Sequence, residues 1–424
     1  MKLTAFFFGL FLFLQSQNSM AAFSNYNSIL IGDQAAGMAG AYTALHSDAS
    51  ALAWYNPATL ALLEGQSFSA AVGIYKKFDT QYGQAEDITK SALKVNQGFF
   101  RSLPSSTGSI VRYKDFLKEY LQEYTFALSI VTPEYDNYKG DVTSTSDHKT
   151  SLSVTDESLW VGVAVARKIS YREAFGITFY YTARSYVRSI QDRTFQGTNQ
   201  LKYYYVEDRA ITQNSLITVL GYHYTFSPEW KLGVSLRLSD LQISGTGTYA
   251  DSYFDSVSTT TTSNNLDIVK SKSHIPGKLT IGIAWERPNF LILSADITAY
   301  QPLSYNDIDD PRFAEKIENL AVYNTSFGAE YFFNDWLKFR GGVFTNYSSH
   351  PYPDISKTRG QGDRVNQFGF SANAALTSGN IQYTFGGYYT GGKGKSSQRI
   401  DQAIQLVDKT QHIFTMLVGT SYAF

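Results

Sequence analysis

The sequence predicts an all-β protein, a transmembrane antiparallel β-barrel of about 14 strands. Three observations predict this fold class. Apolar and polar residues alternate along many short segments, the connections between these segments alternate in length, and the chain ends in Tyr422-Ala423-Phe424. Alternation at period two is typical of a strand with lipid on one side and an aqueous lumen on the other.

The composition agrees with a membrane barrel and excludes several other classes. The chain has 424 residues with 31 Tyr, 29 Phe and no Cys, and only 17% of its residues are charged, against about 25% in soluble globular domains. Without Cys there are no disulfides, thiolate metal sites or Cys nucleophiles. The 36 basic and 37 acidic residues nearly balance, which argues against binding to nucleic acid, since neutralising phosphates takes a basic surface.

The N-terminus reads as a secretory signal peptide, residues 1–21. Lys2 is followed by an apolar run from Leu3 to Leu14, and a small-residue cleavage site ends at Ala21. A run of 12 residues is too short to cross a bilayer, which takes about 20 apolar residues. We therefore expect an exported chain, either released or built into an outer membrane as strands.

Thirteen strands can be read directly from the alternation. The segments are 68–74, 124–130, 159–165, 175–181, 216–222, 232–238, 279–285, 291–297, 323–331, 337–343, 368–374, 381–385 and 414–424. A soluble β-sandwich or propeller is the alternative. In an up-and-down barrel the first two of these segments would both run outward, so residues 78–123 must contain a returning strand. Residues 95–100 or 108–113 could supply it, which makes fourteen; helical spacing over 110–124 also suggests a short amphipathic helix.

The connections alternate between short turns and long polar segments. Short turns fall at 227–229, 287–289, 334–335 and 378–380, and we expect the long segments 132–157, 186–212, 240–276, 301–320, 346–363 and 391–410 to be outer loops. Outer-membrane barrels have this asymmetry, with the short turns in the periplasm. Trp230, Trp285 and Trp336 lie beside short turns, where an interfacial aromatic girdle is expected.

Residues 22–65, which we call the N-terminal segment, do not alternate and are rich in Ala and Gly. The lumen of a barrel this wide would leak unless it were filled. We expect the N-terminal segment to fold into the lumen as a hatch, and residues 66–424 to form the barrel. A disordered periplasmic tail is the alternative, but such tails are usually more polar and charged.

The N-terminal segment resembles the corresponding region of the long-chain fatty acid transporter family (FadL type). The shared pattern has Gly and Ala, then Asp-Ala-Ser, then Asn-Pro-Ala. In this sequence the pattern is Gly37, Gly40 and Ala41, then Asp48-Ala49-Ser50, then Asn56-Pro57-Ala58. The resemblance implies a fourteen-stranded barrel with a luminal hatch, and a kinked third strand that opens a lateral route into the membrane. It covers about 30 residues, and over the rest of the chain it is architectural only.

The expected function is passive uptake, across the outer membrane, of long-chain fatty acids or similar hydrophobic molecules. Candidate ligand contacts are the aromatic and aliphatic residues Phe99, Phe100, Leu103 and Ile110, which we expect among the outer loops. A polar-solute porin and a scaffold or secretion-associated barrel are alternatives. The six His show no pair at metal-ligand spacing, and no nucleophile or cofactor motif is convincing, so we expect no metal, no cofactor and no enzymatic activity. The expected partners are a hydrophobic ligand, outer-membrane lipid and the barrel assembly machinery.

The C-terminal strand provides the first testable prediction. Phe424 ends an alternating segment and resembles the signal that outer-membrane barrels present to their assembly machinery. Deleting Phe424 should slow insertion into outer membranes, because it removes the terminal aromatic of this signal. Pulse-chase appearance of the heat-modifiable folded form measures the rate, and insertion of the truncated chain at the normal rate would contradict the prediction.

Overall fold

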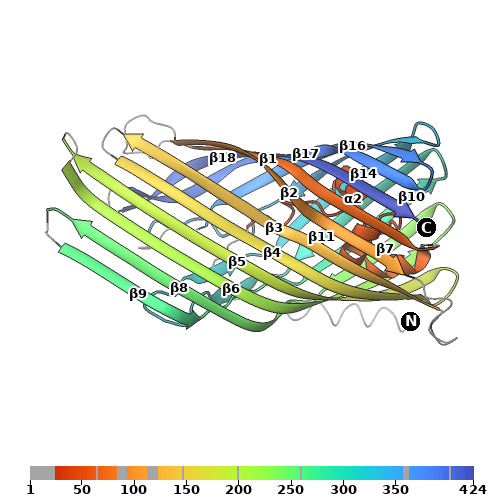
Figure 1. Ribbon diagram of the computed structural model, residues 1–424, viewed down its shortest axis with the longest axis horizontal. Helices are drawn as coiled ribbons and strands as arrows, with labels where there is room; N and C mark the ends of the chain where they lie inside the picture. The colour runs from red at the N-terminus through yellow and green to blue at the C-terminus, as the bar shows by residue number, and fades with distance from the viewer. Residues whose placement is uncertain are drawn as a thin grey trace.

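The computed structural model describes residues 24–63, 65–83, 93–111, 123–145, 148–197, 200–257, 260–356, 362–400 and 403–424. They form a closed antiparallel barrel of 14 strands (Figure 1), which confirms the predicted fold class and strand number. The barrel strands are β1 (Ser67–Tyr82), β2 (Leu93–Val111), β3 (Tyr124–Thr145), β4 (His148–Lys168), β5 (Glu173–Gln196), β6 (Gln200–Thr225), β7 (Trp230–Arg237), β10 (Lys278–Arg287), β11 (Leu291–Tyr300), β14 (Val322–Phe332), β15 (Leu337–Asn346), β16 (Arg364–Ser378), β17 (Ile381–Ile400) and β18 (Ala403–Ala423). Pairing of β1 with β18 closes the ring.

The returning strand required by parity is β2. It contains both candidate segments, 95–100 and most of 108–113, in one strand that pairs with β1 from Ser67 opposite Ile110 to Tyr82 opposite Leu93. The suggested amphipathic helix over 110–124 falls mainly on residues 112–122, which lie outside the described part of the chain.

The predicted alternation places large apolar side chains on the outer surface. The exposed set on barrel strands includes Phe68, Leu128, Leu159, Val161, Val163, Phe175, Phe179, Tyr181, Ile281, Ile283, Leu293, Ile297, Phe327, Phe339, Val343, Phe368, Phe370, Phe385, Phe414 and Met416. A soluble protein rarely exposes so large an apolar surface. A closed barrel with this apolar belt has the architecture of an outer-membrane protein.

The prediction of long outer loops is wrong for most of the six polar segments. Residues 132–157, 186–212 and 391–410 mainly continue the strands of β3–β4, β5–β6 and β17–β18 as long hairpins. Their Thr, Tyr and Val residues favour extended backbone, so the ladders continue beyond the length that a bilayer needs, about 9–11 residues.

Two other predicted loops contain hairpins of their own. Segment 240–276 holds β8 (Leu241–Asp255) and β9 (Thr260–Lys270), which extend the sheet from the outer part of β6. Segment 301–320 holds the short pair β12 (Leu303–Asn306) and β13 (Lys316–Asn319). Only 346–363 has no strand among its described residues.

The short turns are where the sequence predicts them. Each joins neighbouring strands at the end of the barrel that holds the C-terminus, at the right of Figure 1. Trp230 and Trp285 lie opposite each other on β7 and β10, and Trp230 and Trp336 are about half exposed. Their position at this rim fits an interfacial girdle.

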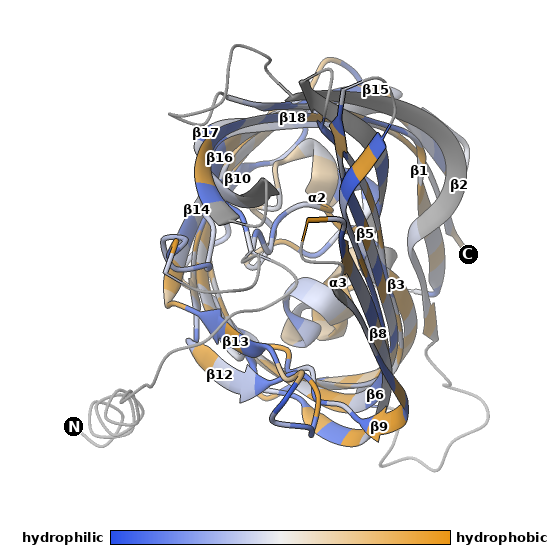
Figure 2. Cartoon of the chain, turned by 90° about the vertical axis from the view of Figure 1, so that its left-hand side faces the viewer, coloured by the Kyte–Doolittle hydropathy of each residue, from blue (hydrophilic) through white to orange (hydrophobic). Residues whose placement is uncertain are grey.

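The N-terminal segment lies within the ring of strands, as Figure 2 shows for its two helices. It contains α2 (Asp33–Gly37), α3 (Ala49–Tyr55) and the 3₁₀ helix η1 (Pro57–Leu62). Its apolar side chains make the largest buried cluster together with inward-facing residues of the wall, including Ile110, Ala127, Ala164 and Ala284. The hydrophobic core of this protein therefore lies between the N-terminal segment and the barrel. Among the described residues, no helix has the length and hydrophobicity to cross a bilayer.

The topology gives a second prediction. A small labelling tag inserted between Asp255 and Thr260, at the tip of the β8–β9 hairpin, should react on intact cells because this end of the barrel faces outward. The same tag at 378–380 should react only after the outer membrane is permeabilised. Reactivity with the opposite pattern would invert the orientation.

Candidate functional site

Seven glycines on the inner wall make room for the N-terminal segment. They lie on seven different strands, and a Cβ at any of them would come within 3.0 Å of an atom of the segment. The seven are Gly176, Gly221, Gly233, Gly282, Gly328, Gly342 and Gly419. A Cβ at Gly328, for example, would lie 2.5 Å from the carbonyl oxygen of Met38. Real Cβ atoms essentially never approach other atoms so closely, so the wall and the segment fit together only because side chains are absent at these positions.

The Asn-Pro-Ala part of the motif fixes the segment to β6. The Asn56 side chain accepts a hydrogen bond from the Ala58 N–H (3.1 Å) and thereby caps η1, while Pro57 occupies the first helical position, where its missing N–H costs nothing. The Asn56 amide donates to the carbonyl oxygens of Thr43 (2.8 Å) and of Tyr222 on β6 (3.0 Å). Asn56 therefore connects the 3₁₀ helix, the preceding loop and the wall.

The remaining motif residues also contact the wall or turn the chain. The Asp48 carboxylate accepts from the Ser69 hydroxyl on β1 (3.0 Å) and from the backbone N–H of Gln34 (3.3 Å). The carbonyl oxygen of Gly37 accepts from the Ser371 hydroxyl on β16 (2.8 Å). Gly40 has φ +77°, a conformation in which a side chain would be strained.

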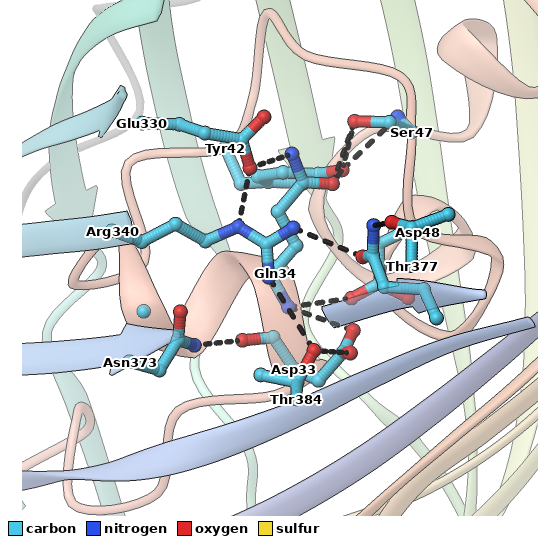
Figure 3. Close-up of polar contacts among 12 residues, drawn as sticks. Asp33, Gln34, Tyr42, Ser47, Asp48, Glu330, Arg340, Asn373, Thr377 and Thr384 are labelled. Carbon is cyan, nitrogen blue, oxygen red and sulfur yellow. Dashed lines mark hydrogen bonds and ion pairs between the residues drawn. The ribbon is translucent and has the colours of Figure 1, made fainter. Parts of the chain in front are cut away.

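A buried polar network joins α2 to the opposite wall (Figure 3). Thr384 on β17 donates to the Asp33 carboxylate (2.6 Å), and the Gln34 amide donates to Glu330 on β14 (2.9 Å). Arg340 on β15 forms an ion pair with Glu330. The three wall residues are at most 4% exposed, and burying charges is tolerated only where they are paired and hydrogen-bonded. The network therefore fixes one position of α2 in the lumen.

Burial also sets the ionisation of two residues of the N-terminal segment. Burial raises the pKa of Tyr42 well above its ordinary value, and the nearby Asp48 carboxylate acts in the same direction. The Tyr42 hydroxyl stays protonated and donates to the Gln34 side chain (2.8 Å). Burial, together with the positive charge of Lys231, lowers the pKa of His46 to about 3, so His46 is neutral at physiological pH.

A cavity of about 60 Å³ lies between the N-terminal segment and the wall. Strands β3, β4, β7, β10, β11 and β14 contribute to it, and residues 25–30 of the segment cover one side. The rings of Trp54 and Trp160 meet edge to face with centroids 5.0 Å apart, and both line the cavity. Tyr26 stacks on Tyr300 at 4.5 Å on the same lining. Aromatic rings thus form one part of a lining that also contains polar and charged residues, a combination typical of sites for small ligands.

Two buried cations face this aromatic lining. The Arg237 guanidinium lies 5.8 Å from the ring centroid of Trp54 and 5.5 Å from that of Trp160. The Lys278 ammonium lies 5.0 Å from the ring centroid of Trp54. One Arg237 amine donates to the Pro276 carbonyl (3.0 Å), while its Nε has no hydrogen-bond partner among the described residues.

Asp296 connects the cavity to the N-terminal segment. One carboxylate oxygen accepts from the backbone N–H groups of Tyr42 and Thr43, both at 3.0 Å. The other oxygen has no hydrogen-bond partner in the described part of the chain. The cavity therefore holds donors and an acceptor that are available for the polar group of a ligand.

The barrel wall is interrupted beside the cavity. Among the described residues, the β2–β3 ladder runs from Ser106 to Val111, opposite Val131 to Phe126. After Val131, β3 continues to pair with β4. The register of this β3–β4 ladder shifts between Val131 and Glu134, at Pro133. A proline cannot donate to a ladder and is typical of bulges and edge strands. Pro133, Glu134 and Tyr135 line the cavity, so the bulged part of β3 is directly next to it.

The structure places the four predicted ligand residues on β2 rather than in a loop, which corrects that part of the prediction. Phe99, Phe100 and Leu103 belong to the part of β2 that pairs with β1. The structure describes their backbone but not their side chains. Ile110 is buried against the N-terminal segment and does not line the cavity. Ligand contact by these residues stays a prediction.

Sequence reasoning missed the charged residues of the cavity. Arg237, Lys278 and Asp296 are buried on β7, β10 and β11, and Glu134 on β3 lines the same cavity. An ionisable residue inside a membrane-spanning strand is costly and usually functional. That signal is present in the alternation, since Arg237 lies between Leu236 and Leu238, and Asp296 between Ala295 and Ile297.

The fold is that of known outer-membrane transporters for hydrophobic compounds. A FadL homologue from Pseudomonas aeruginosa superposes with a TM-score of 0.66 at 13% identity, covering 96% of this chain and all of the other. The toluene transporter TodX of P. putida gives 0.65 at 13% identity, covering 93% and 98%. The toluene transporter TbuX of Ralstonia pickettii gives 0.57 at 16%, with the same coverage. No protein-family model and no curated protein sequence matches this chain.

The wall glycines provide a third prediction. Gly221→Val and Gly328→Val should each displace the N-terminal segment while leaving the barrel folded, because the new side chains occupy space filled by Asn56 and Met38. Single-channel conductance in planar bilayers should rise toward that of a chain lacking residues 23–60. Gly341→Val is the matched control, since a Cβ there meets nothing closer than 3.7 Å. Unchanged conductance in folded variants and in the deletion would show that the segment does not close the lumen.

Proposed function

We propose that this protein carries hydrophobic molecules passively across the outer membrane, with long-chain fatty acids or similar amphiphiles as its substrates. The observation that carries the proposal is the cavity between the N-terminal segment and the interrupted wall. The aromatic part of its lining can hold an apolar chain, and the bulged part of β3 lies beside it. The named substrates of structural neighbours, among them toluene, belong to the same chemical class.

The physical need for such a protein is clear. Apolar solutes cross the polysaccharide-coated outer leaflet slowly, and a protein site that is apolar inside lowers this barrier without an energy source. Movement then follows the concentration gradient. In this proposal no residue acts as a catalyst.

The N-terminal segment is the hatch in this proposal. It fills the lumen, and its contacts with the wall glycines and with Asn56 support a defined closed position. The cavity is smaller than the roughly 150 Å³ that accommodates benzene in a protein interior. A ligand therefore needs part of the hatch to move, and the route from the cavity to the membrane passes between β2 and β3.

The two buried cations favour ligands that carry an acidic head. Arg237 and Lys278 both face the cavity, and a carboxylate is the complementary group because guanidinium and ammonium groups form their strongest hydrogen bonds with it. Two carboxylates, those of Glu134 on β3 and Asp296 on β11, also line the cavity and balance the charge of the two cations. The preference for an amphiphilic acid rests on Arg237, whose buried Nε has no hydrogen-bond partner among the described residues.

Two other functions were expected as alternatives. A polar-solute porin would need an aqueous channel through the lumen, whereas the N-terminal segment and its apolar cluster occupy that space among the described residues. A scaffold or secretion-associated barrel would act through a protein partner and would show no ligand transport. The uptake experiment therefore separates it from a transporter.

Uptake into proteoliposomes tests the proposal. The wild-type protein should accelerate entry of both palmitate and toluene above that of empty liposomes. Arg237→Met and Lys278→Met should each lower palmitate binding about tenfold, the effect expected when a hydrogen bond to a charged group is lost, with a smaller effect on toluene. Arg287→Met, at the exposed end of β10, is the control. Wild-type protein that accelerates neither probe would eliminate the transporter and favour the scaffold.

A further inference from the structure

Residues 301–320, which we call the outer cap, pack against the wall at the outer end of the barrel. The cap contains β12 and β13, which lie near β9 in Figure 2. Ile308 forms an isolated antiparallel bridge with Ser271, directly after β9. Ile308 and Phe313 also form a buried apolar cluster with Tyr249 of β8, in which the rings of Tyr249 and Phe313 have centroids 4.9 Å apart.

Two arginines of the wall hold the cap. Arg188 of β5 and Arg209 of β6 lie directly opposite each other in the ladder. Arg209 forms an ion pair with Asp307 of the cap and donates to the Phe313 carbonyl (3.1 Å). One Arg188 amine donates to Glu315 of the cap (2.8 Å). The Glu315 carboxylate also lies 3.5 Å from Arg209, so it is shared between the two guanidinium groups.

The cap reverses the net charge of this cluster. On the wall, Glu207 of β6 forms ion pairs with both arginines, so the wall alone brings two cations and one anion. Asp307 and Glu315 add two carboxylates, which changes one excess positive charge into one excess negative charge. Like charges directly opposite in a ladder are destabilising, and Arg209 is only 1% exposed. The two arginines therefore need an anion from outside the wall.

We infer that Arg188 and Arg209 form an entry site for the carboxylate head of an amphiphilic acid, and that the cap keeps this site closed by presenting Asp307 and Glu315 in place of the ligand. This inference rests on the proposed function and goes further, because it adds a second ligand site and states what closes it. Guanidinium groups bind carboxylates with paired N–H donors. The Nε of each arginine has no hydrogen-bond partner among the described residues, so both retain a donor for the ligand.

The entry site lies farther out than the cavity. Arg237, which lines the cavity, is opposite Val219 of β6, and Val219 is opposite Thr178 of β5. Arg188 is ten positions beyond Thr178 on the same strand, which corresponds to roughly 33 Å at the rise of a β-strand. A ligand that arrives from outside therefore meets the two arginines before it reaches the cavity.

The cap also contacts the chain that covers the outer side of the cavity. The Lys272 N–H donates to the Asp307 carbonyl (2.8 Å), and the rings of His274 and Tyr305 meet edge to face with centroids 5.0 Å apart. Ile275 follows directly and lines the cavity. Displacing the cap loosens this cover, so binding at the entry site is linked to access to the cavity.

An acidic ligand can exchange with the cap without leaving an arginine unpaired. The closed cluster has one carboxylate more than it has cations, and a ligand carboxylate that replaces Glu315 keeps the charge the same. A neutral ligand brings no anion, so it cannot compensate for the loss of the cap carboxylates. The entry site therefore selects acids over neutral molecules of the same chain length.

Binding of palmitate and of neutral hexadecanol to the purified full-length protein tests the entry site. Asp307→Asn combined with Glu315→Gln removes the competing charges, and it should tighten palmitate binding at least about tenfold, the effect of one hydrogen bond to a charged group. Hexadecanol binding should not change. Adding Arg188→Met should abolish the gain. Asp310→Asn is the matched control, because Asp310 lies in the cap but pairs with the exposed Arg312 of the same turn.

A single thiol reports movement of the cap. The chain has no Cys, and Ile308 is buried, so Ile308→Cys should react slowly with a maleimide. Palmitate should raise this labelling rate at least severalfold, and hexadecanol should not. Asp309→Cys, at an exposed neighbouring position, is the control and should react rapidly with or without a ligand.

The outcomes separate this inference from the function on which it rests. If the wild-type protein neither binds nor transports palmitate, the proposed function and the entry site both fail. If it binds palmitate, but the double variant binds no tighter or Ile308→Cys is labelled at the same rate with palmitate, the entry site alone is overturned. Equal tightening for palmitate and hexadecanol, with the heat-modifiable folded form intact, also overturns it, because a cap that is merely loosened would act on both ligands.

Discussion

The inner wall of the barrel encloses a folded segment, residues 24–63. The steric fit between this segment and the wall decides where the core, the polar network and the cavity can form. Strand side chains pointing inward would normally fill this volume. At seven positions the wall carries glycine instead, and there backbone or side-chain atoms of the N-terminal segment lie directly against the strand backbone. Close approach brings Asn56 within hydrogen-bonding distance of the Tyr222 carbonyl on β6.

This fit makes the N-terminal segment part of the core. In an outer-membrane barrel the apolar outer face is solvated by lipid, so little core can form outside. The apolar residues that are removed from both lipid and water are those of the segment and the inward-facing wall. Charged groups in the same space, such as Glu330 with Arg340, are paired and add specificity of position. The segment is thus held by packing and oriented by polar contacts.

The positions of the strands can be predicted from the sequence because, in a barrel strand, successive side chains point alternately to the lipid and to the lumen. Apolar and polar residues therefore alternate along it. The returning strand β2 could be inferred only from parity, since Pro104 and the polar residues around it interrupt its alternation. The strand ends were missed for a different reason: residues 132–157 are polar enough to resemble a loop, yet their Thr, Tyr and Val residues pair in a hairpin. The residues that meet around the cavity could not be predicted from the sequence either. Trp54 and Trp160 are 106 positions apart, and only the seating of the segment brings their rings together.

The two sides of the cavity differ in how firmly they are held, and this difference determines where opening costs least. Residues 33–62 are largely buried, and their displacement would expose the main apolar cluster to water. Residues 25–29 are only half-buried. They are attached mainly by five hydrogen bonds of Asn25 and Asn27 to β11, β15 and β16 and by the stacking of Tyr26 on Tyr300, not by packing into the main apolar cluster. Local opening is drawn from the least stable parts of a structure. Enlarging the cavity by releasing residues 25–29 would therefore preserve the glycine contacts and the polar network of α2, and the rest of the N-terminal segment would stay in the lumen.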